Sequence, residues 1–469
     1  MADIYDIVVI GSGPAGYVCA IRASQLGLKA ACVESSSYEG GFGGTCLNWG
    51  CIPTKALLKS AQVFNYINHA GNYGVKVEGN VSADFEGMVS RSREVASGMS
   101  NGIQFLFKKN KIEHIAGYGK ILPGKKVEVT DADGNKSEIS ANHIILATGA
   151  RSRELPFLKQ DGQKVIGYRE AMTLPKQPKS LVVVGSGAIG SEFAYFYNSI
   201  GTEVTLIEVL PEIVPLEDTE VSKQLGRSFK KAGIKVLTGV SVEEVDASGK
   251  TCKVKVKTKK GEEVIDAEIV LSAVGIAPNL DGIGLEETGL ATENGKVKVD
   301  DYYRTNVDGY YAIGDIVHGP ALAHVASHEG ITCVEKIAGM GPEPIDYGNI
   351  PACTYTNPEV ASVGMTEQQA KDAGYEIKVG KFPFTASGKA SAAGSKDGFV
   401  KVIFDAKYGE WLGCHMLGDN VTEMIAEAVV ARKLETTGHE IIKSVHPHPT
   451  MSEAVMEAVA AAYGEVIHL

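Results

Sequence analysis

Two cysteines, Cys46 and Cys51, are the residues of this chain best suited to chemistry. They lie five residues apart in a run rich in glycine, from Gly43 to Lys55. A cross-link closing so short a loop removes only about 2 kcal/mol of chain entropy, against about 4.7 kcal/mol for a hundred-residue loop. Because such a bond contributes little stability, the pair is better explained as a store of two electrons. The alternatives are two inert thiols or half of a zinc site, although no second close Cys pair or Cys/His cluster follows.

A glycine-rich turn near the start of the chain predicts a dinucleotide site. The apolar run Ile7–Ile10 indicates a strand that leads through Gly11, Gly13 and Gly16 into a helix-like stretch, and a second strand then ends at Glu34. Glycines at these positions permit a tight turn and let the backbone approach a pyrophosphate at the positive end of a helix. The acid is placed to accept hydrogen bonds from an adenosine ribose.

The same arrangement occurs a second time. The run Leu181–Val184 leads through Gly185, Gly187 and Gly190 into another helix-like stretch, and the strand after it ends at Glu208. The interval from the last glycine to the acid is 18 residues in both copies. One glycine fingerprint is weak evidence, but two copies that share strand, helix and acid at equal spacing predict two dinucleotide sites.

Glu208 also indicates which nicotinamide dinucleotide the second site prefers. A site for NADP places a basic residue near the 2′-phosphate, which a carboxylate would repel. No Arg or Lys occurs from Val209 to Thr219. We therefore expect NAD rather than NADP. The alternative is that Glu208 only ends a strand in solvent and that basic groups arrive from elsewhere in the fold.

Three further apolar runs end in residues that suit a nucleotide site. One ends in Thr148 and Gly149, another in Gly314 and Asp315, and a third at Gly275. The Asp315 carboxylate is able to bind a ribose or ribityl hydroxyl, although Gly-Asp is also a common turn.

Composition limits the class of protein. A length of 469 residues suggests about three domains. Hydrophobic content of 44% and charge of 22% are ordinary for a globular protein. The net charge of −11 argues against a general nucleic-acid binder and permits attraction to a basic partner surface.

Cysteine usage and hydropathy bear on location. The eight cysteines are spread thinly, which is typical of reducing compartments rather than of secreted proteins. The first strand begins near Tyr5, which leaves no room for a signal or transit peptide, and no long uncharged apolar stretch is present. We expect no membrane span and a cytoplasmic location, or the mitochondrial matrix if a presequence has been removed.

The patterns predict an α/β fold with two Rossmann-like dinucleotide-binding domains and a C-terminal α+β domain. The expected boundaries are 1–150 and 280–348 for a discontinuous first domain, 151–279 for the second and 349–469 for the third. Helices are expected over 54–70, through the 90s to 109, from 321, over 422–434 and over 452–462. A turn at 131–135 and the stretch 253–263 indicate hairpins, and 399–404 indicates a strand.

A His-Pro-His-Pro segment near the C-terminus offers an acid–base group. Its two prolines stiffen the chain, and Thr450 or Ser452 is placed to cap the helix that follows. A carboxylate at Glu453, five residues after His448, is able to fix the tautomer of that imidazole and to raise its basicity. From spacing alone, surface histidines beside a helix start, His446 among them, are the simpler interpretation.

Together these motifs resemble class I of the pyridine nucleotide–disulfide oxidoreductase family. The resemblance extends from Asp6 to about Glu453, and the stretch from Gly43 to Lys55 is its most specific part. It implies FAD at the first glycine turn, NAD at the second and a C-terminal domain for dimerisation. In this family the active-site histidine comes from the neighbouring subunit, which implies an obligate homodimer.

The resemblance also implies roles for individual residues. Cys51 resembles the sulfur next to the flavin, and Cys46 the sulfur that meets the substrate. His448 resembles the catalytic base, and Glu453 the carboxylate that orients it. The expected cofactor-binding residues are Gly11, Gly13, Gly16, Glu34, Lys55, Thr148, Gly149, Gly185, Gly187, Gly190, Glu192, Glu208, Gly275, Gly314, Asp315 and Ala323.

Two of these residues resemble an ion pair, and some positions depart from the family pattern. Lys55 resembles a lysine near the flavin N5, and Glu192 resembles its partner. Trp49 is bulky where a small aliphatic residue is common, and Ser327 replaces a more usual acid. Neither departure removes a group that the chemistry requires.

The implied reaction is oxidation of a dihydrolipoyl group with reduction of NAD⁺, and no metal is expected. The implied partners are the lipoyl domain of a 2-oxoacid dehydrogenase or glycine cleavage complex, and the subunit-binding module of the E2 subunit. A glutathione-reductase-like or mercuric-reductase-like activity is the alternative, and those enzymes favour NADPH. A role mainly as an assembly subunit on a basic binding module is a further alternative.

Overall fold

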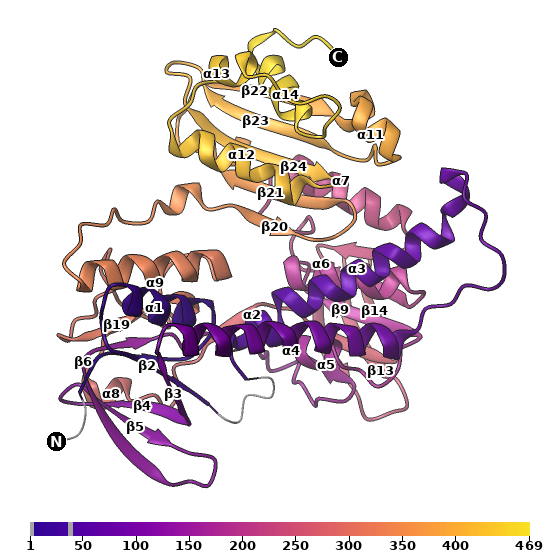
Figure 1. The fold of residues 1–469 in the computed structure, drawn as a ribbon. Helices are drawn as coiled ribbons and strands as arrows, with labels where there is room; N and C mark the ends of the chain where they lie inside the picture. Colours follow the sequence, from indigo (N-terminus) through magenta and orange to yellow (C-terminus); the bar gives the residue numbers. More distant parts are fainter. Residues whose placement is uncertain (1–3, 36–40) are drawn as a thin grey trace. The chain divides into compact units, whose positions relative to one another are not determined.

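The computed structural model describes residues 4–35 and 41–469. The chain forms two compact units, each assembled from three segments (Figure 1). Unit 1 comprises Met1–Leu57, Asp84–Arg153 and Ile276–Ile345, and unit 2 comprises Leu58–Ala83, Glu154–Gly275 and Asp346–Leu469. The sequence places 58–83 in the first domain, whereas these residues group with unit 2. The three-domain boundaries stay a prediction.

A parallel sheet forms the centre of unit 1. Its strands run in the order β3 (Glu113–Ala116), β2 (Ala30–Glu34), β1 (Tyr5–Ile10), β6 (Lys136–Leu146) and β19 (Tyr310–Ala312). The first half of β6 also pairs antiparallel with β5 (Lys126–Thr130), which pairs with β4 (Tyr118–Leu122). Strand β1 is almost wholly buried, as expected where both faces of a parallel sheet are covered.

The helices of unit 1 position the first glycine turn and the cysteine segment. Helix α1 (Pro14–Gln25) packs against α9 (Ala323–Ile337), and a Cβ at Gly330 would lie 2.8 Å from the Ala15 carbonyl oxygen. Glycine there permits the close approach of the two helices. Helix α2 (Gly44–Trp49) packs against α4 (Phe85–Lys109). Smaller elements of this unit are β7 (Ala150–Ser152), β16 (Ile276–Pro278), α8 (Leu285–Thr288), β17 (Thr292–Glu293) and β18 (Lys296–Val297).

Unit 2 contains a second parallel sheet. Its order is β11 (Lys235–Thr238), β10 (Glu203–Glu208), β9 (Ser180–Val184), β15 (Ile269–Ser272) and β8 (Val165–Ile166). Helices α6 (Ala188–Ser199), α7 (Thr219–Lys231) and α5 (Tyr168–Ala171) accompany it. Strands β12 (Ser241–Asp246), β13 (Cys252–Thr258) and β14 (Gly261–Ala267) form a separate antiparallel sheet.

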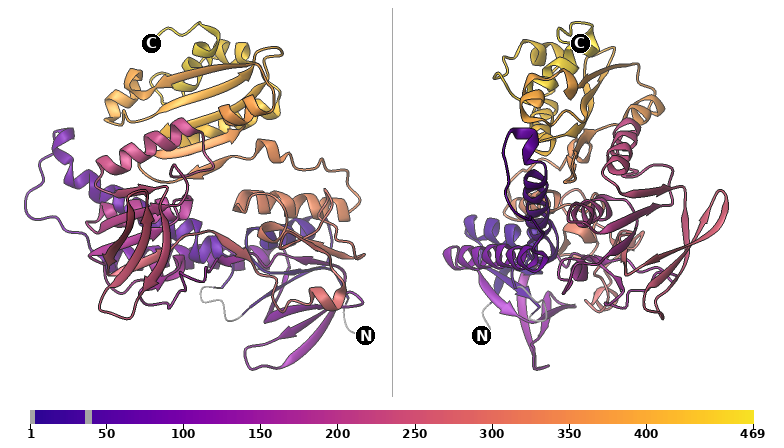
Figure 2. Two further views of the ribbon diagram at one scale, coloured as in Figure 1. Left: turned by 180° about the vertical axis from the view of Figure 1, so that it is seen from behind. Right: turned by 90° about the vertical axis from the view of Figure 1, so that its right-hand side faces the viewer.

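The last part of unit 2 is an antiparallel sheet with helices, drawn in orange and yellow in Figure 2. Its order is β20 (Ala352–Thr354), β21 (Glu359–Gly364), β24 (Trp411–Gly418), β23 (Phe399–Asp405) and β22 (Ile377–Pro383). Helix α12 (Val421–Lys433) packs against β21 and β24, and α14 (Glu453–Tyr463) packs against β22 and β23. The other helices are α10 (Glu367–Asp372), α11 (Gly388–Ala393) and α13 (Gly438–Lys443).

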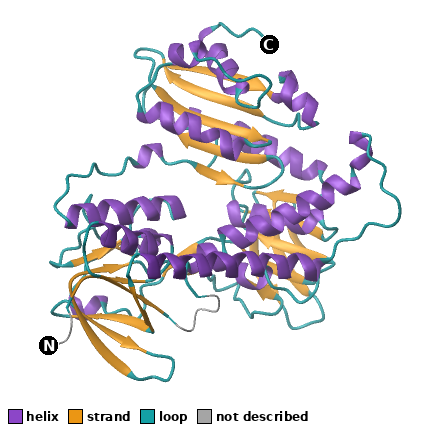
Figure 3. Ribbon diagram, in the orientation of Figure 1, coloured by secondary structure: helices purple, strands orange, loops and turns teal. Residues whose placement is uncertain are grey.

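The predicted α/β class is confirmed, with two Rossmann-like βαβ arrangements and a C-terminal α+β sheet (Figure 3). The hairpin signals at 131–135 and 253–263 are also confirmed. Helix α3 (Cys51–Asn68) begins three residues earlier than the sequence suggests, so that Cys51 itself opens it. Helix α4 begins at Phe85, where the Asp84 side chain accepts a hydrogen bond from the Gly87 backbone N–H.

A buried lysine joins the second nucleotide fold to the C-terminal sheet within unit 2. Lys401 of β23 is 1% exposed, and its ammonium lies 3.0 Å from Asp218, 2.9 Å from Glu220 and 2.7 Å from Glu367. Burial alone would lower the pKa of Lys401, but hydrogen bonds to Glu367 and Glu220 and the charge of Asp218 outweigh it and raise the pKa to about 12. Lys401 therefore stays charged at neutral pH.

Replacing this lysine should destabilise the protein strongly. Lys401→Met removes the only ammonium that contacts the buried Asp218 carboxylate in the described structure, and an ion pair broken on one side costs about 3 to 5 kcal/mol of unfolding free energy. The control is Lys381→Met, because Lys381 also pairs with Glu220 but is about 41% exposed, so its loss should cost under about 1 kcal/mol. Denaturant unfolding compares the two variants, and equal losses would contradict the interpretation.

Candidate active site

The outer glycines of both nucleotide loops are required by the protein's own packing. Gly11 has φ +105°, and a Cβ there would lie 2.3 Å from the Ala147 carbonyl oxygen. Gly185 has φ +98°, and its Cβ would lie 2.4 Å from the Ala273 carbonyl oxygen. The third glycines, Gly16 and Gly190, leave no room either, since a Cβ would approach a carbonyl oxygen of the same loop to 1.8 Å and 1.9 Å respectively.

The middle glycines, Gly13 and Gly187, are not required by the packing of the protein itself. Gly187 has φ −63° and ψ −175°, which any residue adopts, and a Cβ there would meet no protein atom within 4 Å. Gly13 has φ −64° and ψ −178°, and its Cβ would meet only the Gly44 Cα, at 3.9 Å. Each stands at the N-terminus of a helix, α6 and α1. Space left open beside free N–H groups of a helix start fits a pyrophosphate.

The acid after each loop fastens that loop to the sheet. The Glu34 Oε2 accepts hydrogen bonds from the Ser12 backbone N–H at 2.7 Å and from the Ser12 hydroxyl at 2.6 Å. The Glu208 Oε2 accepts the same pair from Ser186, at 3.0 and 2.7 Å. Glu208 is 7% exposed, so it does not merely end a strand in solvent. The sequence did not single out either serine, although both occupy the same position in their fingerprint.

Two strand-end turns of unit 1 are held by residues that the sequence analysis missed. The Thr148 hydroxyl donates to the Asn279 carbonyl oxygen at 2.7 Å, and the Asn279 amide donates back to the Thr148 carbonyl oxygen at 3.0 Å. The Gly314 backbone N–H donates to Glu329, an acid that is 1% exposed. The sequence offered one signal for Glu329: it is an acid in the middle of an apolar helical pattern, which indicates a buried carboxylate with a specific partner.

Other predicted cofactor residues lie at turns and helix starts. Burial raises the pKa of Asp315, against the opposing charge of Lys296. Ala323 is the first residue of α9, and Gly275 has φ +105°. Glu192 of α6 is 5% exposed and accepts a hydrogen bond from the Tyr355 backbone N–H at 3.0 Å. Lys55 belongs to unit 1 and Glu192 to unit 2, so their pairing stays a prediction.

The structure brings the Cys46 and Cys51 side chains into hydrogen-bond contact. Cys46 is half-buried in the short helix α2, whereas Cys51 is exposed and begins α3. The hydrogen bond with the Cys51 sulfur, burial and negative charge at Cys51 all raise the pKa of Cys46; the charge of Lys55 and the Cys51 backbone N–H oppose them. Cys51 is the first residue of α3, and the N-terminus of a helix favours a thiolate.

Asn48 ties the cysteine helix to the loop that precedes it. Its side-chain amide donates to the carbonyl oxygens of Phe42 at 2.9 Å and Gly44 at 3.1 Å. The Gly43 backbone N–H in turn donates to the Ser12 carbonyl oxygen at 3.0 Å. The first nucleotide loop and the cysteine helix are thus joined through one short set of hydrogen bonds.

The predicted acid–base pair of unit 2 is formed. The His448 Nδ1 lies 2.8 Å from the Glu453 Oε1, and the other oxygen of Glu453 accepts the Thr450 backbone N–H at 2.8 Å. Burial raises the pKa of Glu453, but the Thr450 N–H and His448 outweigh it, and the net shift is downward. A carboxylate held in this way fixes the imidazole orientation and leaves the Nε2 available.

The expected cap of α14 was wrong. Ser452 occupies the N-cap position but its side chain makes no capping hydrogen bond, and the Thr450 hydroxyl donates to the Pro447 carbonyl oxygen instead. The Glu453 carboxylate accepts the Thr450 N–H, which precedes the helix. His446 lies 2.8 Å from Glu427 through its Nε2, and this hydrogen bond raises the pKa of His446.

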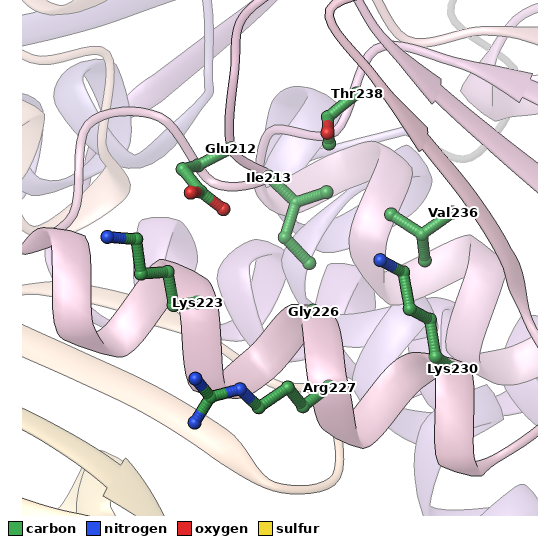
Figure 4. A pocket seen from close by; sticks show the side chains of 8 residues that line it. All are labelled: Glu212, Ile213, Lys223, Gly226, Arg227, Lys230, Val236 and Thr238. Carbon is green, nitrogen blue, oxygen red and sulfur yellow. The ribbon is translucent and has the colours of Figure 1, made fainter.

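A separate hollow lies between α7 and β11 of unit 2 (Figure 4). None of the predicted site residues lines it. Its lining residues are Glu212, Ile213, Lys223, Gly226, Arg227, Lys230, Val236 and Thr238. Its basic residues, Lys223, Arg227 and Lys230, come from α7, which follows the 209–219 interval that lacks Arg and Lys. Glu208 does not line the hollow; its carboxylate accepts hydrogen bonds from Ser186 and from the Leu210 backbone N–H.

Within residues 4–35 and 41–469, no three or more His, Cys, Asp or Glu side chains are grouped so as to hold a metal ion. None of the helices described there combines the length and apolar character needed to cross a bilayer.

Comparison with known proteins identifies relatives over the whole chain. Residues 5–330 match the family model for pyridine nucleotide-disulphide oxidoreductases, and residues 350–459 match the model for the dimerisation domain of these enzymes. A dihydrolipoyl dehydrogenase of Rhizobium etli is 48% identical, and one of Zymomonas mobilis is 46% identical, each with 100% of both chains covered. The crystal structure of LpdA from Mycobacterium tuberculosis has a TM-score of 0.90 at 27% identity, covering 97% of this chain and 99% of that one.

Removing the charge of Glu208 should weaken the second nucleotide site alone. Glu208→Gln keeps the shape of the side chain but loses its charge-assisted hydrogen bonds with Ser186, so the Kd for NADH should rise about tenfold. The preference for NADH over NADPH should also fall, because the carboxylate that repels a 2′-phosphate is gone. Fluorescence titration with both dinucleotides measures this. The matched control is Glu34→Gln, which should lower flavin content instead; unchanged discrimination in Glu208→Gln would contradict the assignment.

Proposed function

Because this chain belongs to the pyridine nucleotide–disulphide oxidoreductase family, we propose that it is a dihydrolipoyl dehydrogenase. It oxidises protein-bound dihydrolipoamide to lipoamide and reduces NAD⁺ to NADH. The observation that carries the proposal is the match along the full length of the chain, at up to 48% identity, to relatives that bear this name. The contact between the Cys46 and Cys51 sulfurs and the His448–Glu453 pair supply the chemical groups that the reaction needs.

The two nucleotide loops are the proposed cofactor sites. FAD would be held in unit 1 by the loop Gly11–Gly16, Glu34, the Thr148–Gly149 turn and Asp315. NAD would be held in unit 2 by the loop Gly185–Gly190, Glu208 and Gly275. The open space at the middle glycines supports both assignments. When bound, FAD supplies a two-electron acceptor beside the dithiol, and NAD⁺ supplies the final hydride acceptor.

His448 is the proposed base for the substrate. A thiol with a pKa near 8.5 is only a few per cent thiolate at pH 7, so a base is needed to generate the nucleophile. The imidazole takes the thiol proton, and Glu453 stabilises the imidazolium that results. The His448 side chain is about 78% exposed, which is compatible with a role in the active site of a neighbouring subunit.

The proposed exchange transfers two electrons from substrate sulfur to enzyme sulfur. In the oxidised enzyme Cys46 and Cys51 share a disulfide. The substrate thiolate attacks the Cys46 sulfur, the Cys46–Cys51 bond breaks, and Cys51 leaves as a thiolate. The second substrate thiol attacks the substrate sulfur of the mixed disulfide and gives its proton to the departing Cys46 sulfur, so that Cys46 leaves as a thiol and the cyclic lipoyl disulfide forms. The substrate has then lost two electrons and two protons.

The dimerisation-domain match over 350–459 supports a homodimer. The further partners are proposed as a lipoyl domain of a 2-oxoacid dehydrogenase or glycine cleavage complex and the binding module of its E2 subunit. A reductase of the glutathione or mercuric type remains the alternative, and its preference for NADPH separates it from the proposed activity.

Anaerobic titration tests the function directly. Dihydrolipoamide should bleach the flavin partly and produce a long-wavelength thiolate–flavin band, and NAD⁺ should then restore the oxidised spectrum. Cys51→Ser should lose that band, because it removes the thiolate placed at the start of α3. Cys46→Ser is the control and should keep a thiolate at Cys51. Reduction by NADPH but not by dihydrolipoamide would contradict the proposal.

His448→Gln should lose most dithiol oxidation while the protein keeps its FAD and its oligomeric state. The expected loss is about 10²- to 10⁴-fold in kcat, because general base catalysis is removed. His446→Gln serves as the control, since His446 pairs with Glu427 and not with Glu453. Steady-state rates with dihydrolipoamide measure the effect, and near-normal turnover of His448→Gln would remove the imidazole from the mechanism.

A further inference from the structure

We propose that Arg93 of α4 is a positioning residue for the cysteine pair: by holding the end of α2 it fixes the α2–α3 junction and favours the thiolate of Cys51. The inference deepens the proposed function and rests on it, because it takes Cys46 and Cys51 as the redox pair. Arg93 lies 42 residues after Cys51 in the sequence, and the packing of α4 against α2 brings it to the junction.

Arg93 makes two contacts with the last turn of α2. Its Nη1 donates to the Asn48 carbonyl oxygen at 2.7 Å, and its guanidinium carbon lies 4.7 Å from the centroid of the Trp49 ring. A planar guanidinium is able to stack on an aromatic face and donate in its own plane at the same time, which an ammonium is not. Trp49, bulky for the family pattern, thus has a specific partner.

The position of these contacts bears on the charge at Cys51. The last carbonyl groups of a helix lack helical partners and form the negative end of its dipole. Helix α2 ends at Trp49, two residues before Cys51, so these carbonyls oppose a thiolate there. Arg93 satisfies one of them and brings a full positive charge to the same place. The N-terminus of α3 then acts on Cys51 with less opposition.

The same contacts restrain the loop in front of Cys46. Asn48, whose carbonyl Arg93 holds, uses its side chain to hold the carbonyl oxygens of Phe42 and Gly44. Asn48 is 1% exposed, so these bonds face little competition from water. Arg93 is half-buried, and its charge is therefore screened less than that of a surface arginine.

Arg91 supplies a matched comparison on the same helix. Its Nη1 donates to the Ala56 carbonyl oxygen at 2.9 Å, so it too joins α4 to a neighbouring helix through one arginine–carbonyl bond. Arg91 is exposed, and Ala56 lies inside α3 rather than at the junction. Substitution of either arginine removes one positive charge and one hydrogen bond between helices. Only substitution of Arg93 removes the contact with the Asn48 carbonyl oxygen at the α2–α3 junction.

The experiment compares the holoenzymes of wild type, Arg93→Gln, Arg93→Lys, Trp49→Leu and Arg91→Gln. Each is equilibrated with reduced and oxidised dithiothreitol at fixed ratios, and the disulfide fraction of the Cys46–Cys51 peptide is measured by acid quenching, alkylation and mass spectrometry. A second readout is the pH midpoint of the thiolate–flavin band. Flavin content and thermal unfolding report whether each variant is folded.

In Arg93→Gln the band midpoint should rise by about one pH unit, and the equilibrium constant for reduction of the pair should fall about tenfold. Arg93→Lys should recover part of both effects, because it keeps the charge. Trp49→Leu should shift both in the same direction by about half as much, and it decides the matter if Arg93→Gln does not fold. Arg91→Gln should stay within about 0.3 pH unit of wild type.

Two outcomes would overturn the role of Arg93. One is a midpoint and disulfide fraction that match wild type in folded Arg93→Gln, or in Trp49→Leu if Arg93→Gln does not fold. The other is a shift of equal size in Arg91→Gln. Dithiothreitol reduces the pair whatever the natural substrate is, so these results are independent of whether dihydrolipoamide reacts. Failure of the wild type to react with dihydrolipoamide, with an intact dithiothreitol response, would reject the proposed substrate and leave the role of Arg93 standing.

Discussion

The hydrogen bonds from one serine to one carboxylate hold each nucleotide loop of this protein against its sheet. In both copies the acid at the end of the second strand accepts from the backbone and the hydroxyl of the serine that follows the first glycine. Without this contact the loop would have only glycines at its turns and little to fix its path. In unit 1 the same serine, Ser12, also accepts the Gly43 backbone N–H, so the loop that begins the cysteine segment takes its position from the nucleotide loop.

Electrostatics then distinguish the two sulfurs that this scaffold brings together. The hydrogen bond with the Cys51 sulfur and burial raise the pKa of Cys46, while Cys51 lies exposed at a helix start. The difference arises from where the helices begin and end, since α2 stops at Trp49 and α3 starts at Cys51.

The sequence predicted the parts of the site that depend on local patterns. Both fingerprints and the acids Glu34 and Glu208 follow from spacing within one strand–turn–helix unit. Spacing alone favoured a surface histidine at His448, and the family resemblance assigned it Glu453 as its partner. The sequence did not predict Glu329, Asn279 or Arg93, because each reaches its partner from a distant segment through packing of α9, of the 276–345 segment or of α4. The cap of α14 was mistaken because the Thr450 hydroxyl donates to the Pro447 carbonyl oxygen, a contact that the local pattern does not reveal.

The strand order of unit 1 has a consequence for synthesis on the ribosome. Strand β19 pairs with the second half of β6, yet the whole of 154–275 is made between them. Until β19 emerges, that side of β6 is an open edge of a nascent apolar sheet, able to pair with a wrong chain. The parallel sheet of unit 2 can close in the meantime, because its five strands are complete by residue 272. All five strands of the later nucleotide sheet are therefore synthesised before the last strand of the N-terminal sheet.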